Sequence, residues 1–434
     1  MEVQRYEYMN TTFFQGKDKA FTILLCMGIF YVLALPLILF NINYGRAFDD
    51  QKLFHYPTIL HFIQSLDFSD YPSATTPGYH VLLGFVGQLF SSNEIILKLT
   101  SSAFTAALIG IIVERLYSHF GKLHSILLSL PMILSIYIFP SGVWLLPDNL
   151  AWLTVLGVFI IATKSELLNK HFLYLAFILI LAMMVRQPFL WLASTIWASA
   201  LAYYSYNTAE LSDRGSFLLK GVLATLPAFA IFYYFYVLWG GLVPPSFQNS
   251  HQNISLATPA FFLSVFAFYS LFFLPVMYGT IRDVISSSKF KWVMFGCVIG
   301  FIIAVIPDTS YSKELGRYSG LWNFVKIAPT IADKSTFIML LSSLGGGLFV
   351  LFCTVLPPRI RLIFALSTIA FVFSLMPNKY VFERYMSGYI FIFIYCTLCH
   401  IKLKNNPLPA VVAWSGPVIF AAFNGLVLVR SMLA

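Results

Sequence analysis

Two adjacent acids, Asp49 and Asp50, follow the first long apolar run and precede the sequence Phe54-His55-Tyr56-Pro57. Partial desolvation at a membrane interface suits a carboxylate to general-base catalysis. A third acid, Asp148, lies in a later polar turn, directly after a proline. Carboxylates from separate loops could act as a base and an orienting group, or could hold a divalent cation. The simpler alternatives are solvated loop acids for the pair and a helix N-cap for Asp148.

Cationic and aromatic side chains in the other polar turns could bind an anionic substrate. Arg186 lies between two apolar runs, where an ionisable residue is costly and suggests a function. Its planar guanidinium suits a phosphate group, and the alternative is that it reaches out to water at the membrane surface. The further candidates for substrate binding are His55, Gln187, His251, Arg317, Tyr318, Arg384 and Tyr385.

Several common catalytic motifs are missing from the sequence. It contains no zinc-protease histidine pair, no phosphate-binding loop of nucleotide hydrolases, no dinucleotide-binding glycine pattern and no nucleophile elbow. No segment predicts a soluble nucleotide-binding domain. If the protein is a transferase, we therefore expect its donor to be lipid-borne rather than a nucleotide sugar, and the only cofactor suggested is a divalent cation.

The composition predicts an all-α polytopic membrane protein. Of the 434 residues, 59% are hydrophobic, 18% aromatic and only 10% charged, whereas soluble domains average about 25% charged residues. The net charge of +9 is spread singly between apolar segments. This pattern indicates membrane topology and argues against a nucleic-acid partner.

Apolar runs of membrane-spanning length indicate about thirteen transmembrane helices. We expect them near 20–42, 95–113, 124–140, 149–163, 171–187, 189–205, 217–238, 258–278, 291–307, 335–356, 361–376, 385–401 and 408–430. The run 79–90 is too short to span and predicts an interfacial helix. The chain therefore forms one transmembrane domain, 1–434, in which 43–94 is the first external loop.

The distribution of Lys and Arg predicts the orientation of this domain. Most basic residues lie in the N-terminus and in alternate short loops, whereas the long loops 43–94 and 308–334 hold fewer for their length. The positive-inside rule then places the N-terminus in the cytoplasm and all of the candidate residues above on the external or lumenal side.

The order of these blocks resembles the GT-C superfamily of glycosyltransferases, which use polyprenyl-phosphate sugars. An acidic pair follows the first helix, and Thr75-Thr76-Pro77-Gly78 leads into an interfacial helix and then a spanning helix that ends in Glu114-Arg115. Protein O-mannosyltransferases and lipid A aminoarabinose transferases share this plan. The resemblance covers about the first 120 residues.

A closer resemblance is to the dolichyl-phosphate-glucose alpha-1,2-glucosyltransferase family. The matching blocks are the Phe-His-x-Pro and Thr-Thr-Pro-Gly segments, Arg186-Gln187 with Trp191, Gly240-Gly241 with His251, Arg317-Tyr318 and Arg384-Tyr385. Asp148 stands where that family has a glutamate. The spacing from acid to His-Pro differs by one residue, so Asp49 and Asp50 both remain candidates for the catalytic position.

The resemblance implies an inverting hexosyltransferase, with glucose favoured, that acts on a glycan or a lipid-linked acceptor. Asp50 or Asp49 would be the base, and Arg186, Arg384 or Arg317 would stabilise the leaving phosphate. The implied location is a bacterial cytoplasmic membrane, or the endoplasmic reticulum membrane in a eukaryote. The alternatives are a flippase of lipid-linked glycans and an envelope-glycan polymerase or ligase.

Overall fold

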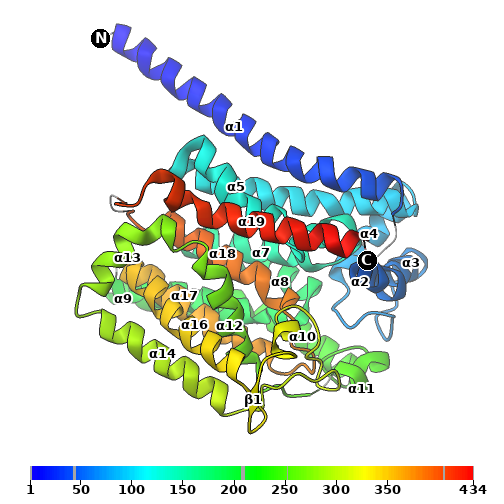
Figure 1. Ribbon diagram of the computed structural model, residues 1–434. Helices are drawn as coiled ribbons and strands as arrows, with labels where there is room; N and C mark the ends of the chain where they lie inside the picture. Colours follow the sequence, from blue (N-terminus) through cyan, green and yellow to red (C-terminus); the bar gives the residue numbers. More distant parts are fainter. Residues whose placement is uncertain (1, 43–44, 207–210, 252, 404–405, 434) are drawn as a thin grey trace.

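The computed structural model describes residues 2–42, 45–206, 211–251, 253–403 and 406–433, and it consists almost entirely of helices (Figure 1). In this part of the chain the strands are β1 (Thr330–Ile331) and β2 (Lys334–Ser335), which form one small antiparallel hairpin. The predicted all-α membrane architecture is confirmed.

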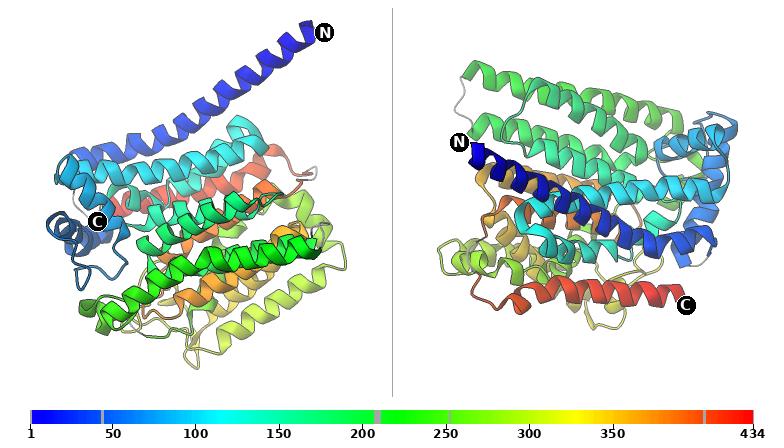
Figure 2. Two further views of the ribbon diagram at one scale, coloured as in Figure 1. Left: turned by 180° about the vertical axis from the view of Figure 1, so that it is seen from behind. Right: turned by 90° about the horizontal axis from the view of Figure 1, so that it is seen from above.

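The longer helices run alongside one another as a bundle (Figures 1 and 2). They are α1 (Glu2–Leu39), α5 (Glu94–Ile133), α7 (Asp148–Ala162), α8 (Asn169–Val185), α9 (Leu192–Tyr206), α10 (Leu211–Trp239), α12 (Thr258–Leu271), α14 (Phe290–Val305), α16 (Thr336–Val355), α17 (Pro358–Leu375), α18 (Arg384–His400) and α19 (Ala410–Leu433). Each predicted span overlaps one of these helices.

Length separates the helices into two groups. Among the described residues, six helices are long and apolar enough to cross a membrane, or seven if the bent pair 258–271 and 275–285 counts as one span. Three shorter apolar helices, α7, α8 and α14, have 15 to 17 residues. At 1.5 Å per residue these are somewhat shorter than a hydrocarbon core of about 30 Å.

The helix α5 contains two of the predicted spans, because the chain reverses direction inside it. Gly121 has a non-helical backbone with φ of +72°, a conformation that side chains other than glycine rarely adopt. Before this break Glu114 pairs with Lys19, and after it Ser129 lies 3.6 Å from Cys26. The second half therefore runs back alongside α1.

Short helices gather at one end of the bundle (Figure 1). They are α2 (Gly45–Asp50), the π-helix η1 (Gln51–His55), α3 (Tyr56–Gln64), α4 (Gly78–Leu89), α6 (Ile138–Val143), η2 (Gln187–Trp191), η3 (Pro245–Phe247), α11 (Gln248–His251) and α15 (Trp322–Val325). Two others, η4 (Pro275–Met277) and α13 (Tyr278–Ile285), follow α12. The predicted interfacial run 79–90 is α4, and it is a helix of 12 residues.

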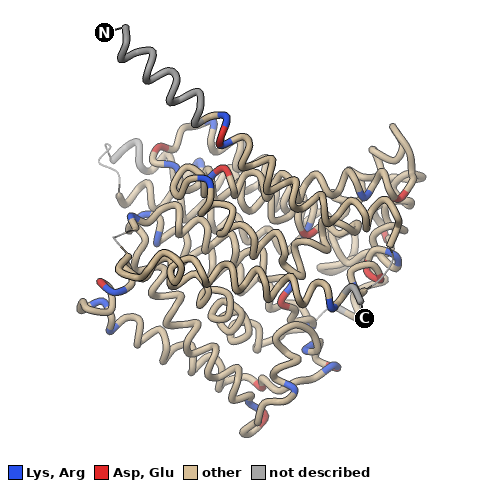
Figure 3. Tube along the Cα trace, turned by 45° about the horizontal axis from the view of Figure 1, so that its top comes forward, with Lys and Arg blue, Asp and Glu red and all other residues tan. Residues whose placement is uncertain are grey.

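Contacts between loops agree with the predicted alternation of sides. At one end Asp50 pairs with Arg384, and Trp239 donates a hydrogen bond to the carbonyl of Phe68. At the other end Arg359 hydrogen-bonds to the backbone of Lys164. Figure 3 shows the charged residues mostly toward the two ends of the helices. We call the end that contains Asp50 and Arg384 the acidic-loop end.

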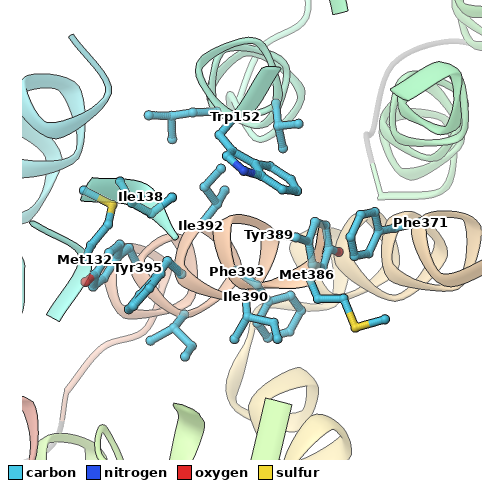
Figure 4. Close-up of a cluster of buried hydrophobic side chains, with 14 of the residues drawn as sticks. Met132, Ile138, Trp152, Phe371, Met386, Tyr389, Ile390, Ile392, Phe393 and Tyr395 are labelled. Carbon is cyan, nitrogen blue, oxygen red and sulfur yellow. The ribbon is translucent and has the colours of Figure 1, made fainter. Parts of the chain in front are cut away.

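The helix α18 is the buried centre of the bundle. Every residue from Met386 to Tyr395 is buried, and aromatic and aliphatic side chains of α5, α6, α7 and α17 pack around it (Figure 4). The ring of Tyr389 stacks on Phe371 with centroids 4.3 Å apart. Gly388 lets α7 approach closely, because a Cβ there would lie 2.4 Å from the indole of Trp152. A core this tight fixes where the two helices begin.

Candidate functional site

Four charged side chains from four separate elements meet at the acidic-loop end. Asp50 ends α2, Asp148 begins α7, Arg186 directly follows α8 and Arg384 begins α18. Each lies at a helix terminus, where the chain leaves the apolar bundle. The Trp152–Gly388 contact explains one pairing, because Asp148 and Arg384 each lie four residues, about one helical turn, before those contact residues.

The four side chains form alternating ion pairs. Arg384 Nη1 lies 2.5 Å from Asp50 Oδ2, and Arg186 Nη1 lies 3.1 Å from Asp148 Oδ1. Arg384 Nε is 3.9 Å from Asp148 Oδ2, so Arg384 joins the two pairs. Neither Asp148 oxygen has a well-aligned hydrogen bond within the described residues. Asp148 is therefore not the N-cap that its position after a proline suggested; its carboxylate faces the two guanidinium groups.

Exposure distinguishes the roles of the two paired acids. The Asp148 side chain is 2% exposed, whereas the Asp50 side chain is 31% exposed. The arginines lie between these values, at 10% for Arg186 and 21% for Arg384. Solvent can therefore reach Asp50, whereas Asp148 is buried beside the arginines. Asp49 is exposed, and it takes part in none of the ion pairs of this cluster.

Aromatic rings border the cluster. The guanidinium carbons of Arg186 and Arg384 lie 5.2 and 5.6 Å from the centroid of the Tyr385 ring. On the other side, Tyr318 packs against Phe382 and lies beneath Arg46, whose guanidinium carbon is 5.4 Å from the ring centroid. Two of the predicted binding residues, Tyr318 and Tyr385, thus lie beside the predicted acid and arginines.

Gln187, the residue after Arg186, forms hydrogen bonds that connect neighbouring loops. Its amide oxygen accepts a hydrogen bond from the Thr76 backbone at 3.1 Å, and its amide nitrogen donates to the carbonyls of Ala74 and Leu242. These bonds tie three loops together beside Arg186. Gly78 lies against Met184, where a Cβ would be 2.6 Å from the carbonyl oxygen. The Thr-Thr-Pro-Gly segment therefore packs directly onto the chain that carries Arg186.

Two of the predicted binding residues are not placed in the cluster. Arg317 is buried, and its guanidinium donates to the carbonyl of Asp308 at 2.7 Å while lying over the Trp322 ring. These bonds hold its own loop together, and burial lowers the pKa of Arg317. The side chain of His251 lies outside the described residues, and its backbone ends α11.

A buried carboxylate that we did not predict as a site residue fastens the turn before α18. Glu383 accepts hydrogen bonds from the hydroxyl of Tyr269 at 2.9 Å and from the backbone of Leu321 at 3.1 Å. Burial raises the pKa of Glu383, which these donors partly offset. Its oxygen would lie 2.5 Å from a Cβ on Gly320, so the 316–322 loop can approach only because that residue is glycine. Arg384 is positioned by this anchor.

An apolar cavity begins at Arg186. It has a volume of about 570 Å³, within the range of pockets that hold small-molecule ligands. Arg186, Gln187 and Tyr385 line its polar part. The remaining wall is largely aromatic and aliphatic, with Phe189, Trp191, Trp197, Phe229, Phe232, Leu242, Val243 and Phe373. Trp197 and Phe373 are 41% and 63% exposed on the outside of the bundle, so the cavity opens toward the lipid-facing surface.

No group of three or more His, Cys, Asp or Glu side chains in the described part of the chain is arranged to hold a metal ion. Both acids of the cluster are instead paired with arginines. The donor set that we considered for a divalent cation is thus shared with two positive charges, which does not fit a cation site.

Comparisons with known proteins give little beyond this geometry. No family model matches the chain, and no curated protein matches it. One solved structure that aligns is the crystal structure of ArnT from Cupriavidus metallidurans in the apo state. The alignment covers 86% of this chain and 77% of that chain at 11% identity, with a TM-score of 0.36. A superposition this loose does not define a fold family or an activity.

Proposed function

We propose that this protein is an inverting glycosyltransferase that transfers a sugar from a polyprenyl-phosphate carrier to a glycan or lipid-linked acceptor. The observation that carries the proposal is the position of Arg186, which pairs with Asp148 and also lines the polar part of the apolar cavity. An anion-binding group at the head of a lipid-facing cavity matches an amphiphile with a phosphate head and an isoprenoid tail.

The arginine pair suits the phosphate of such a donor. Two guanidinium groups of low exposure, Arg186 and Arg384, lie on either side of one buried carboxylate. Asp148 would hold both in place, and a phosphate would replace part of their present pairing. The first isoprene units would then lie along Trp191 and Phe229, with the rest of the tail in the lipid.

The reaction is a single displacement. Asp50 accepts the proton of an acceptor hydroxyl as its oxygen forms a bond to the anomeric carbon. The bond between that carbon and the phosphate oxygen breaks on the opposite face, which inverts the configuration. Polyprenyl phosphate leaves with the bonding electron pair, and the arginines stabilise its growing negative charge. Glucose is the favoured sugar because of the sequence resemblance, and the acidic-loop end would face the outside or the lumen.

The test is an assay of the purified protein in detergent or nanodiscs with synthetic polyprenyl-phosphate sugars and a panel of glycan and lipid-linked acceptors. We expect a product of inverted anomeric configuration and release of polyprenyl phosphate. The matched control is the same sugar on a nucleoside diphosphate, which should not be used. Movement of intact donor across a vesicle membrane, without cleavage, would instead support a flippase.

A further inference from the structure

Two histidines contact each other near Arg186 and Arg384 of the proposed phosphate site. His55 Nδ1 lies 2.9 Å from His80 Nε2, and the rings are nearly parallel, with centroids 5.2 Å apart. His80 is fully buried and His55 is 5% exposed. The proposed reaction assigns no role to His80, although its ring lies near Arg186.

The surrounding elements hold this pair rigidly. His55 ends the π-helix η1, and His80 is the third residue of α4. The neighbouring Tyr79 hydroxyl lies 2.8 Å from the Ser101 hydroxyl, and Gly84 brings α4 within contact of the Phe62 backbone in α3. Single π-helical turns occur often at functional sites. The imidazole contact is therefore fixed by the packing of three elements.

Burial favours the neutral form of both rings. Burial, and then the charge of Arg186, lowers the pKa of His80 to about 3. Burial also lowers the pKa of His55 well below 6.5, and His80, Arg384 and Arg186 lower it further. Each neutral imidazole carries one N–H group, so the shared contact permits only two arrangements of the protons. Either His80 Nε2–H donates to His55 Nδ1, or His55 Nδ1–H donates to His80 Nε2.

The environment of His80 Nδ1 distinguishes the two arrangements. This atom is buried and has no hydrogen-bond partner within the described residues. If His55 were the donor, His80 would carry its proton on Nδ1, and a buried N–H would lack an acceptor. Buried N–H groups without partners are rarer in proteins than buried acceptors without donors. The favoured arrangement has His80 Nε2–H as donor, which leaves His55 protonated at Nε2.

We propose that His80 is a positioning residue that fixes His55 as its Nε2–H tautomer, so that His55 presents a neutral N–H donor to the phosphate held by Arg186 and Arg384. This inference rests on the proposed function, because it names the phosphate as the acceptor. A neutral donor adds a hydrogen bond to the leaving group without adding another buried charge.

Two substitutions of His80 separate this role from a merely structural one. In His80→Gln the side-chain amide nitrogen falls near the position of imidazole Nε2 and can still donate to His55. In His80→Asn the amide nitrogen falls nearer the position of Nδ1 and cannot. We expect kcat/KM for the lipid-phosphate donor to stay within about threefold in the glutamine variant and to fall roughly 10- to 100-fold in the asparagine variant.

The controls distinguish a loss of activity caused by misfolding from one caused by the changed hydrogen bond to His55. Thermal unfolding in detergent of both variants shows whether each is folded. If the two folded variants have equal kcat/KM, the positioning role is wrong. If the wild-type protein transfers no sugar at all, the proposed function fails instead, and the tautomer must be measured directly.

That direct measurement is ¹⁵N NMR of the wild-type protein labelled at histidine, with the His55 signals assigned from a His55→Gln sample. We expect a protonated Nε2 and an unprotonated Nδ1 at His55. A protonated Nδ1 at His55 in the wild-type protein would overturn the inference, whatever the activities of the variants.

Discussion

At the scale of single residues, exposure separates acids that look equivalent in the sequence. Asp49 and Asp50 are adjacent, but only Asp50 pairs with Arg384, while the buried Asp148 lies behind both arginines. The sequence predicted all three as candidates and could not choose between Asp49 and Asp50. The ion pair with Arg384 distinguishes Asp50 from Asp49. Arg384 lies in α18, more than 330 residues later in the chain, so no local pattern could show this contact.

Arg186→Ala should reduce use of the donor far more than it reduces folding, because Arg384 remains 3.9 Å from Asp148 and keeps that buried carboxylate beside a positive charge. A charge-assisted contact to a phosphate contributes roughly 1.5–3 kcal/mol, which corresponds to about a 10- to 150-fold loss in donor kcat/KM. Arg186→Lys should lie between, because lysine keeps the charge but not the planar fork. Steady-state kinetics at varied donor concentration check this. Unaltered donor kinetics in a folded Arg186→Ala protein would leave the Asp148 ion pair with a structural role only.

Asp148→Asn should weaken donor binding by the arginines more than it weakens use of the acceptor. Removing the buried charge leaves Arg186 without its paired carboxylate, and breaking one partner of a buried ion pair costs about 3–5 kcal/mol. We therefore expect a lower melting temperature together with a raised KM for the donor. Differential scanning fluorimetry and donor kinetics measure both effects. A normal melting temperature with loss of turnover alone would instead indicate direct contact of Asp148 with the reacting atoms.

Arg317 and Glu383 show which contacts a sequence cannot predict. Arg317 and Tyr318 were predicted to bind substrate together. The guanidinium of Arg317 instead donates hydrogen bonds to backbone carbonyls of its own loop. Glu383 was visible beside Arg384, but its partners Tyr269 and Leu321 come from two other segments. Partners of this kind are decided by long-range packing, so no local pattern distinguishes a loop anchor from a ligand.

At the scale of elements, the site depends on how closely α7 packs against α18. Apolar length predicted both helices, but the close contact between Trp152 and Gly388 is invisible in hydropathy. This contact sets the distance between the first residues of the two helices, Asp148 and Arg384. One glycine inside an apolar helix therefore positions two charges that lie about a helical turn away.

Gly388→Ala should increase the distance between the first residues of α7 and α18. The added methyl would lie about 2.4 Å from the Trp152 ring, so the indole or the helix must move. Overpacking of this kind costs typically about 1–3 kcal/mol. We expect a lower melting temperature and weaker donor use. Gly157→Ala on the face of α7 that meets Ile178 of α8 is a matched control, because its nearest neighbour would be 3.5 Å from the Cβ. Equal behaviour of the two variants would contradict this account of the helix contact.

At the scale of the whole molecule, the pattern of apolar runs along the sequence predicted where helices alternate with loops. Runs of apolar residues predicted the helices, and the short run 79–90, predicted as an interfacial helix, forms a helix of 12 residues. Treating it as non-spanning keeps all of the site residues on one side, and the structure brings Asp50, Asp148, Arg186 and Arg384 together. The cavity was not predictable, because its wall combines α9, α10 and α17 in three dimensions.

The same grouping predicts the orientation in the membrane. A reporter inserted near Asp67 should be external, and one inserted after Arg115 should be cytoplasmic, because basic residues are retained on the cytoplasmic side. Accessibility of single cysteines to an impermeant reagent in intact cells checks both positions. Labelling of residues 67 and 115 from the same side would contradict the non-spanning assignment of α4.

The most direct test of the central claim compares Asp50→Asn with Asp49→Asn in the transfer assay. Both substitutions remove one carboxylate and keep its shape, but only Asp50 lies at the arginine pair. General-base catalysis contributes about 10²–10⁴-fold. We predict that Asp50→Asn loses turnover by that factor while its melting temperature and its binding of the lipid-phosphate sugar are retained, and that Asp49→Asn stays close to wild type. Wild-type turnover in Asp50→Asn would contradict the account.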